Sequence, residues 1–321
     1  MTTESWARLS SDAFNVALFS YIAAMVLSFA YLAFRKERLH TVATVVGVVG
    51  LVANAVSIAS RGIAAGRTPW GNMYEYSALI TFLVVLGYLV VIEGRAKVRT
   101  VGGFVYALAV LTMAMAVSFF YVGPTALIPQ LNSYWRQIHV TSMIVASSLL
   151  GIGCLLTIAY LIKAASERRE VDRLRTGTPP PIMGGSGVET SDPAAPPDYA
   201  GGGDEPVGNT TTSRKIALPP SATLDALAYK FIRFGFPVWT FGVICGAIWA
   251  QQTWGRYWGW DPKETWSFIT WVIFAGYLHA RATAGWKGTR AAVVALVGFV
   301  SLLVTYYAVN LWIAGLHSYA T

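Results

Sequence analysis

The sequence is poor in charged residues and in residues that bind metals or carry redox chemistry. Only 12% of its 321 residues are charged, against about 25% in soluble domains. Only two cysteines and four histidines occur. Cys154 and Cys245 lie in separate apolar segments and form no CxxC pair, so we expect buried small side chains, not a disulfide or a thiol redox centre. A phosphate-binding loop, a hydrolase triad and nucleic-acid motifs are also missing, which argues against those classes.

Long apolar runs occupy most of the chain instead. Eight runs approach the roughly 20 residues that a helix needs to cross the hydrocarbon core of a membrane. They cover residues 13–34, 41–60, 74–93, 101–121, 138–165, 229–251, 263–284 and 290–313. Because unpaired backbone groups are too costly in lipid, the runs predict an all-α polytopic membrane protein with eight transmembrane helices. The first run is too long for a signal-peptide core, so we expect it to be retained.

Arginine and lysine are unevenly distributed among the loops. The loops after the first, third, fifth and seventh runs are rich in both, and the alternate loops hold only Arg61, Arg67, Arg136, Arg256 and Lys263. The positive-inside rule therefore places the rich loops in the cytoplasm and both termini outside. This orientation accounts for the net charge of +8, and we expect no nucleic-acid partner.

Residues 166–222 differ in composition from the rest of the chain. The charged stretch Ser166–Arg175 is expected to extend the preceding helix. Pro179, Pro180, Pro181, Gly184, Gly185, Pro196, Pro197, Gly201, Gly202 and Gly203 follow, a composition that cannot build a packed core. We therefore predict a disordered cytoplasmic linker between a five-helix part (residues 1–165) and a three-helix part (223–321). A tether is favoured over a partner-binding segment.

Five of the twelve tryptophans gather between Trp254 and Trp271, around one predicted external loop. The rings within this loop are Trp254, Tyr257, Trp258 and Trp260. Tryptophan often forms a belt at the membrane surface, but this density favours a platform for a flat ligand. The neighbouring Arg256 and Lys263 suit either lipid headgroups or the acidic groups of an amphipathic ligand.

The run from Asp261 to Glu264, directly after the tryptophans, predicts the start of the seventh helix. Asp261 is placed at the N-cap and Glu264 at the third helical position, a variant of the capping box. Capping is therefore the expected role of both carboxylates, and the cap would set the angle between loop and helix. Glu75, at the start of the third helix, is also expected to cap, with an ion pair to Arg136 or Arg256 as the alternative.

Two histidines are predicted on the same membrane face as the Trp-rich loop. His139 lies at the outer end of the fifth run, and His317 lies just beyond the eighth. Two imidazoles beside an aromatic platform suit the axial positions of a haem iron, although each alone also suits an interfacial histidine.

The other two histidines are predicted near the cytoplasmic face. His279 lies roughly 27 Å along the seventh helix, near the inner leaflet. Small residues beside it (Ala275, Gly276 and Ala282) would admit a planar macrocycle or a neighbouring helix. His40 falls in a basic loop, where we expect it to be solvated.

The run from Trp254 to Glu264 resembles the WWD motif of the haem-handling superfamily. Together with His139, His279 and His317, it makes the chain similar to the CcsA (ResC-type) branch, called CcsB in actinobacteria, of cytochrome c biogenesis proteins. The resemblance covers the whole membrane portion and leaves out residues 166–222. It implies a subunit of system II cytochrome c maturation that works with a ResB/Ccs1-type membrane protein. Such a pair moves haem b across the membrane and presents it for thioether attachment to CxxCH apocytochrome c.

The resemblance also implies roles for individual residues. His139 and His317 would be the axial ligands that hold haem against Trp254, Trp258, Trp260 and Asp261. His279 would be one ligand of an entry site within the membrane, with the partner supplying the other.

The same resemblance implies the setting of this chemistry. Thiol-reducing proteins of the pathway would be further partners, and the location would be the bacterial cytoplasmic membrane, or alternatively the plastid thylakoid. The chain would be a component of a haem-lyase complex, with no catalytic residue assigned. The alternatives are a system I-type haem exporter that passes haem to a separate carrier and, more distantly, a membrane glycosyl- or lipid-transferase.

Overall fold

The computed structural model describes residues 2–124, 133–176, 218–313 and 315. Every secondary-structure element in these ranges is helical. The helices are α1 (Thr3–Phe34), α2 (Glu37–Ala65), α3 (Met73–Gly87), α4 (Gly102–Phe119), α5 (Tyr134–Thr176), α6 (Ser221–Trp254), α7 (Pro262–Ala282), α8 (Thr289–Leu303) and α9 (Val309–Trp312). Two π-helical segments continue them, η1 (Tyr88–Arg95) after α3 and η3 (Val304–Ala308) between α8 and α9.

Seven of the described helical units are long and apolar enough to cross a membrane, counting α3 with η1 and α8 with η3 and α9 as single units. The prediction of an all-α polytopic membrane protein is therefore confirmed. Helix α7 is not among the seven, because the polar side chains spread along its 21 residues lower its mean hydropathy. The count of eight spans and the orientation in the membrane stay predictions.

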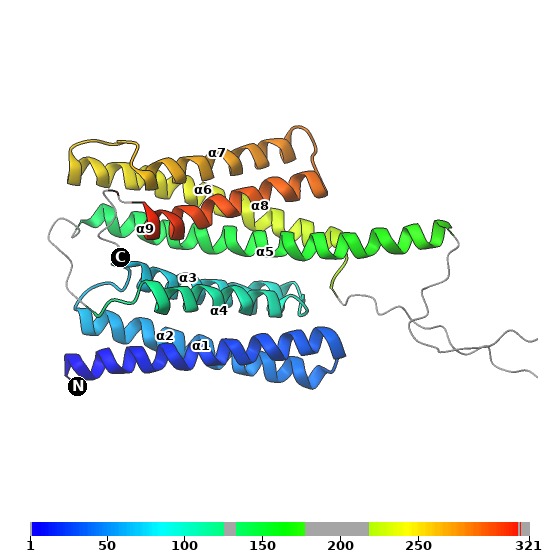
Figure 1. Cartoon of the computed structure of the whole chain (residues 1–321), viewed down its shortest axis with the longest axis horizontal. Helices are drawn as coiled ribbons and strands as arrows, with labels where there is room; N and C mark the ends of the chain where they lie inside the picture. The colour runs from blue at the N-terminus through cyan, green and yellow to red at the C-terminus, as the bar shows by residue number, and fades with distance from the viewer. Residues whose placement is uncertain (1, 125–132, 177–217, 314, 316–321) are drawn as a thin grey trace, which may run out of the picture.

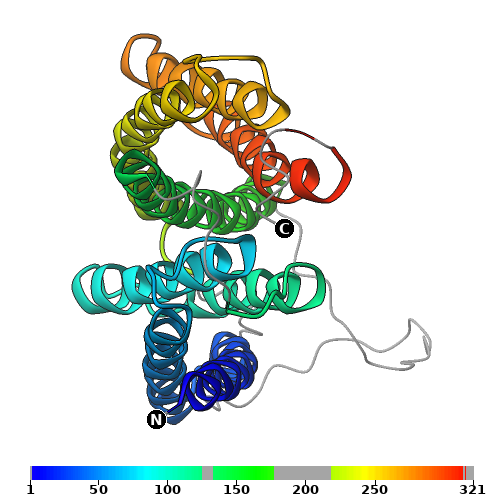
Figure 2. The same ribbon diagram turned by 90° about the vertical axis from the view of Figure 1, so that its left-hand side faces the viewer.

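The helices lie roughly parallel in two groups (Figure 1). The α1–α2 hairpin packs along its length and α4 covers it, while α5 packs along α6. Seen from one end, α5, α6, α7 and α8 form a ring, and α3 and α4 lie between this ring and the α1–α2 hairpin (Figure 2). The connections α2–α3 and α6–α7, together with α9, lie at one end of the bundle, and the connections α1–α2, η1–α4 and α7–α8 lie at the other (Figure 1). We call the first the Trp-loop end, because it carries residues 255–261.

The predicted start of α7 is confirmed by a capping box. The Asp261 carboxylate accepts a hydrogen bond from the Lys263 amide at 3.2 Å, and Glu264 Oε2 accepts one from the Asp261 amide at 3.1 Å. The same Glu264 oxygen accepts a bond from the Gly259 amide at 2.8 Å. At the other side of the loop, α6 is capped by Gly255, whose φ of 72° is readily adopted by glycine. The Trp-rich loop is thus anchored at both ends.

His40 is not solvated, contrary to the sequence prediction. Helix α2 already begins at Glu37, so that His40 lies within its first turns and is buried. Its Nε2 lies 3.3 Å from Glu93 Oε1 of η1, and its ring lies 5.1 Å from that of Tyr31. The prediction was wrong because the helix starts earlier than the apolar run and turns this histidine toward α1 and η1.

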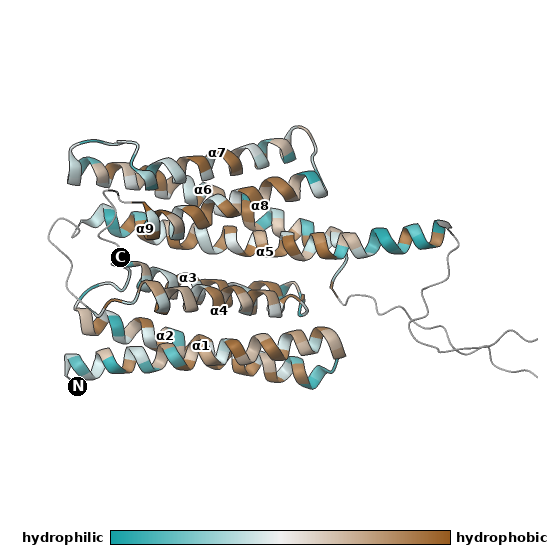
Figure 3. Ribbon diagram, in the orientation of Figure 1, coloured by the Kyte–Doolittle hydropathy of each residue, from teal (hydrophilic) through white to brown (hydrophobic). Residues whose placement is uncertain are grey.

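The end of α5 separates the membrane portion from the linker. Residues Ser166–Arg175 continue α5 beyond the bundle, as predicted, and this extension is hydrophilic while the bundled helices are largely apolar (Figure 3). The rest of the predicted linker lies almost wholly outside the described residues (177–217), so the division into parts stays a prediction. Both cysteines are free and buried, as expected.

Candidate functional site

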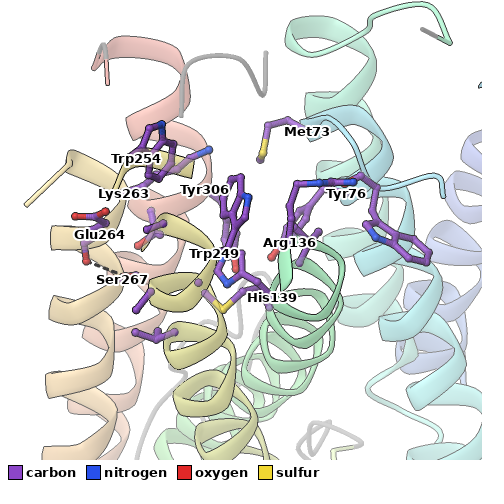
Figure 4. A pocket seen from close by; sticks show the side chains of 18 of the residues that line it. Met73, Tyr76, Arg136, His139, Trp249, Trp254, Lys263, Glu264, Ser267 and Tyr306 are labelled. Carbon is purple, nitrogen blue, oxygen red and sulfur yellow. Dashed lines mark hydrogen bonds between the residues drawn. The ribbon is translucent and has the colours of Figure 1, made fainter. Parts of the chain in front are cut away.

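A cavity opens at the Trp-loop end between α3, α5, α6, the start of α7 and η3 (Figure 4). Its walls include Trp70, Met73, Tyr76, Arg136, His139, Trp249, Trp254, Trp258, Lys263 and Tyr306. About 1010 Å³ of space outside protein atoms lies within it, a volume that includes the open solvent at its mouth. We call it the Trp-loop cavity, and its lining is mostly apolar.

His139 lies in this cavity with a defined ring orientation. Its Nδ1 lies 2.7 Å from the carbonyl oxygen of Gly242 on α6. A carbonyl only accepts hydrogen bonds, so Nδ1 carries the proton and, in the neutral imidazole, Nε2 carries the lone pair. This arrangement is typical of metal-ligating histidines, whose second nitrogen donates to a backbone carbonyl.

The space for the His139 ring is made by a glycine on α6. A Cβ on Gly246 would lie 2.7 Å from His139 Nδ1 and 2.8 Å from Cε1, so any larger residue would displace the ring. The neighbouring Trp249 ring lies 6.1 Å away and inclined by only 25°, and Figure 4 shows the two rings together. Helices α5 and α6 therefore position the imidazole between them.

The loop tryptophans do not all face the Trp-loop cavity. Trp254 and Trp258 line it, and the Trp254 ring lies 5.3 Å from that of Trp249. Trp260 lies outside it and is 67% exposed. Its ring packs edge-on against Trp258 at 5.8 Å and against Phe268 at 6.4 Å. The expected platform thus consists of inner rings, with Trp260 on the outside.

Asp261 is buried and does not line the cavity. It does approach Gly315, where an added Cβ would lie 2.7 Å from Asp261 Oδ1 and 3.2 Å from Pro262 Cδ. The chain after α9 therefore returns to the start of α7. His317 follows Gly315 by two residues and lies outside the described residues.

Two cations line the apolar cavity from different helices. Arg136 of α5 is only 3% exposed, and one of its Nη atoms donates to the Trp70 carbonyl at 3.4 Å. Lys263 lines the cavity from the first turn of α7. The carboxylate of Glu264 also reaches the lining, but its Oε2 already accepts two backbone amides of the Trp-rich loop. The cavity therefore combines aromatic walls with positive charge.

His279 is not brought together with His139. It lies near the opposite end of the bundle, on an exposed face of α7 that also carries Phe268, Val272 and Gly276. A Cβ on Gly276 would have no neighbour within 4 Å among the described residues. The smooth face expected beside His279 is present, and a ligand role for this histidine stays a prediction.

Glu75 pairs with two arginines other than those considered from sequence. Its carboxylate contacts Arg61 at 2.9 Å and Arg67 at 2.7 Å, and the expected alternative partners were therefore wrong. The carboxylate also accepts the Gly71 amide at 2.7 Å, and Asn72 provides the helix cap by accepting the Glu75 amide at 2.9 Å.

Trp249 and Tyr306 line the cavity without having been selected from sequence. For Trp249 a signal existed: Gly242, Gly246 and Trp249 follow a helical spacing of four and three residues, which places them on one face of α6. For Tyr306 no such signal exists, because it lies within the π-helical segment η3, where ordinary helical spacing does not hold.

Comparisons with known proteins identify the class to which this chain belongs. Residues 70–317 match the family described as Cytochrome C assembly protein. The chain belongs to this family of membrane proteins.

The individual relatives are more specific. The chain is 38% identical to the cytochrome c biogenesis protein CcsA of Gloeobacter violaceus, over 95% of this chain and 94% of that protein. It is 34% identical to CcsA of Porphyra purpurea, over 97% of both chains. The predicted resemblance to the CcsA branch is thereby confirmed.

A solved structure shares the fold. Cytochrome c Heme Lyase CcmF superposes with a TM-score of 0.65 at 16% sequence identity, over 96% of this chain and 47% of that chain. This chain thus spans about half the length of CcmF.

Proposed function

We propose that the protein holds haem b in the Trp-loop cavity and presents it for covalent attachment to apocytochrome c. The supporting observation is His139, whose Nδ1 donates to Gly242 and whose Nε2 is thereby oriented as a metal ligand within an aromatic cavity. Membership of the cytochrome c assembly family supports the same reaction class. Haem is the substrate here, passed on to the acceptor protein.

His317 is the second axial ligand in this proposal. Its chain approaches the Trp-rich loop at Gly315, beside Asp261 and two residues before the histidine. Ligation by two histidines fixes the ring plane and occupies both axial positions of the iron. The histidine of the incoming CxxCH motif then replaces one of them, which brings the two cysteine thiols close to the vinyl groups.

Attachment itself is an addition. Each cysteine S–H adds across one vinyl double bond: sulfur bonds to one vinyl carbon, and the other carbon takes the hydrogen. No net oxidant is consumed, but the thiols must be reduced, which is the task of the thiol-reducing proteins of the pathway. The contribution of this chain is proximity and orientation, so no nucleophile or general base is assigned.

Arg136 and Lys263 bind the two haem carboxylates in this arrangement. Both line the cavity, and a guanidinium or ammonium in an apolar surrounding pairs strongly with a carboxylate. The porphyrin face packs on Trp249, Trp254 and Trp258.

Haem enters through a second site at His279. The exposed α7 face with Gly276 leaves room for a macrocycle, and a histidine of the ResB/Ccs1-type partner completes the coordination. An exposed ionisable group on a membrane helix needs such a partner, because burying it in lipid alone is costly. We place the Trp-loop end on the extracytoplasmic side of the bacterial cytoplasmic membrane, with the thylakoid as the alternative, following the distribution of Arg and Lys.

The test is purification of the protein with and without the partner, followed by absorption spectroscopy. Without the partner, the His279 site lacks its second ligand, and wild type is expected to show a low-spin spectrum of haem with two histidine ligands from the outer site alone. His139→Ala and His317→Ala are each expected to lose that spectrum, while His40→Gln, which changes a histidine at the opposite end, keeps it. A spectrum that persists in protein without the partner when both His139 and His317 are replaced would refute the proposed site.

A further inference from the structure

A buried ion cluster lies beside the Trp-loop cavity, and nothing in the proposed haem chemistry uses it. Glu75 is 1% exposed and Arg61 is 3% exposed. Arg61 Nε lies 2.9 Å from Glu75 Oε1, while Arg67 contacts Oε2 at 2.7 Å and Oε1 at 3.1 Å. The Arg61 guanidinium also lies 4.6 Å from the centroid of the Tyr74 ring. We call Arg61, Arg67 and Glu75 the Glu75 cluster.

The Glu75 cluster joins four segments of the Trp-loop end. Arg61 comes from α2, Arg67 from the α2–α3 connection and Glu75 from α3. Arg61 also donates an Nη hydrogen bond to the Val122 carbonyl, in the segment after α4. Through one carboxylate helix α2 is thus tied to the chain that leads into α3.

The same connection forms one wall of the Trp-loop cavity. Trp70, Gly71, Asn72 and Met73 all line it. The Gly71 amide donates to Glu75 Oε2 at 2.7 Å, and a Cβ on Gly71 would lie 2.5 Å from the Arg67 guanidinium. The wall is therefore in direct contact with the cluster, and a side chain at Gly71 would displace the Arg67 guanidinium from its present position.

A link then leads from this wall to the opposite one. The Trp70 carbonyl accepts a hydrogen bond from the Arg136 guanidinium at 3.4 Å. Arg136 lies three residues before His139 on α5. A shift of the Trp70–Met73 segment would move the guanidinium of Arg136 and change the width of the cavity near His139.

Burial of charges such as Arg61 and Glu75 is a poor way to hold helices together. Desolvating ionic groups offsets most of their attraction, and apolar residues of similar volume usually stabilise a fold as well or better. What a satisfied ionic cluster adds is a single geometry, since each hydrogen bond fixes a direction as well as a distance.

We propose that the Glu75 cluster is a positioning device for the haem cavity: it sets the Trp70–Met73 wall, and through the Trp70 carbonyl the Arg136 guanidinium, relative to His139. The proposal rests on the proposed function of the cavity. It also gives the α1–α2 hairpin, which lies outside the matched residues 70–317, a part in the site through Arg61.

The experiment compares two variants of the cluster with a matched control. Glu75→Gln removes the shared acceptor charge. Arg61→Lys keeps the positive charge but cannot span Glu75 and the Val122 carbonyl, because an ammonium lacks the forked geometry of a guanidinium. The control is Asp225→Asn, which breaks the two-point contact of Asp225 with Arg281 (2.7 and 3.0 Å) at the opposite end of the bundle.

Each variant is purified with its partner, and three quantities are measured: folded protein by size exclusion, haem retained per protein, and the absorption spectrum of the outer haem. We expect Glu75→Gln and Arg61→Lys to retain haem about 10- to 100-fold more weakly, with an altered spectrum. Losses of this size are typical of residues that orient a metal ligand without contacting the metal themselves. Asp225→Asn is expected to keep the wild-type spectrum whatever its effect on yield.

Three results overturn the proposal. The first is wild-type retention and spectrum in both cluster variants. The second, if Glu75→Gln does not fold, is a wild-type spectrum in folded Arg61→Lys. The third is an equal spectral change in Asp225→Asn. If wild type itself binds no haem that depends on His139, the proposed function fails instead, and the two failures are thereby distinguished.

Discussion

Gly246→Ala tests the link between helix packing and haem ligation with a single methyl group. The added Cβ would lie 2.7 Å from His139 Nδ1, whereas ordinary contacts begin at 3.4 Å. The imidazole ring must therefore move by about 0.7 Å, because the new Cβ is fixed to the backbone of α6, which cannot shift easily. Such a movement breaks or bends the hydrogen bond from Nδ1 to the Gly242 carbonyl, now 2.7 Å long.

The expected effect on folding is small and the effect on ligation large. Alanine favours a helix by about 1 kcal/mol over glycine, and overpacking costs about 1–3 kcal/mol, so the net destabilisation is only about 0–2 kcal/mol. Displacement of a metal ligand by a fraction of an ångström is expected to weaken haem retention by about 10- to 100-fold.

The assay measures haem per folded protein and the low-spin spectrum, with Gly151→Ala as the control. Gly151 lies on α5, like His139, and its added Cβ would meet only Leu108 at an ordinary 3.8 Å. Gly151→Ala should retain wild-type haem. If Gly246→Ala also binds haem with an unchanged spectrum, the packing of His139 against α6 does not control ligation, and the reasoning is refuted.

Three further predictions concern the Trp-rich loop and the cavity charges. Asp261→Ala should lower the free energy of unfolding in detergent by about 1 kcal/mol, while Asp261→Asn, an equally good cap, should not; a loss of haem binding in the stable Asn variant would show a direct ligand role. Arg136→Gln combined with Lys263→Gln should weaken binding of haem but not of haem dimethyl ester, which lacks the carboxylates; equal losses for both ligands would exclude the assigned pairing. Trp258→Ala, which opens a cavity wall, should reduce haem retention, whereas Trp260→Ala should leave retention intact and reduce only transfer to apocytochrome c; equal retention in both variants would contradict the division into inner and outer rings.

Elements whose contacts are local could be predicted from the sequence. Each of the eight apolar runs coincides with a helix of the structure, because a chain in lipid must satisfy its backbone within each segment. The capping box of Asp261 and Glu264 joins groups only three residues apart, so its residue types suffice to predict it. Successive membrane spans alternate in direction, and this alone predicted that the loop tryptophans and His139 lie on the same membrane face.

The inward faces of the helices could not be predicted in the same way. On α2 the residues turned inward include Gly47, Gly50 and Asn54, whereas Val45 and Val52 are exposed. In water this pattern would be inverted. In a membrane the outer face must be at least as apolar as the core, so apolar periodicity does not reveal which side packs against a neighbour.

The sequence by itself determined the class of protein: a bundle of membrane helices with a capped, tryptophan-rich loop and a small set of histidines. Only the tertiary structure decided which side chains meet. Glu75 pairs with Arg61 and Arg67, and His40 lies beside Glu93. His139 forms a hydrogen bond with a carbonyl 103 residues away in sequence. Local structure depends on neighbours in the chain, whereas these contacts depend on how helix faces pack in space, and that packing belongs to the whole bundle.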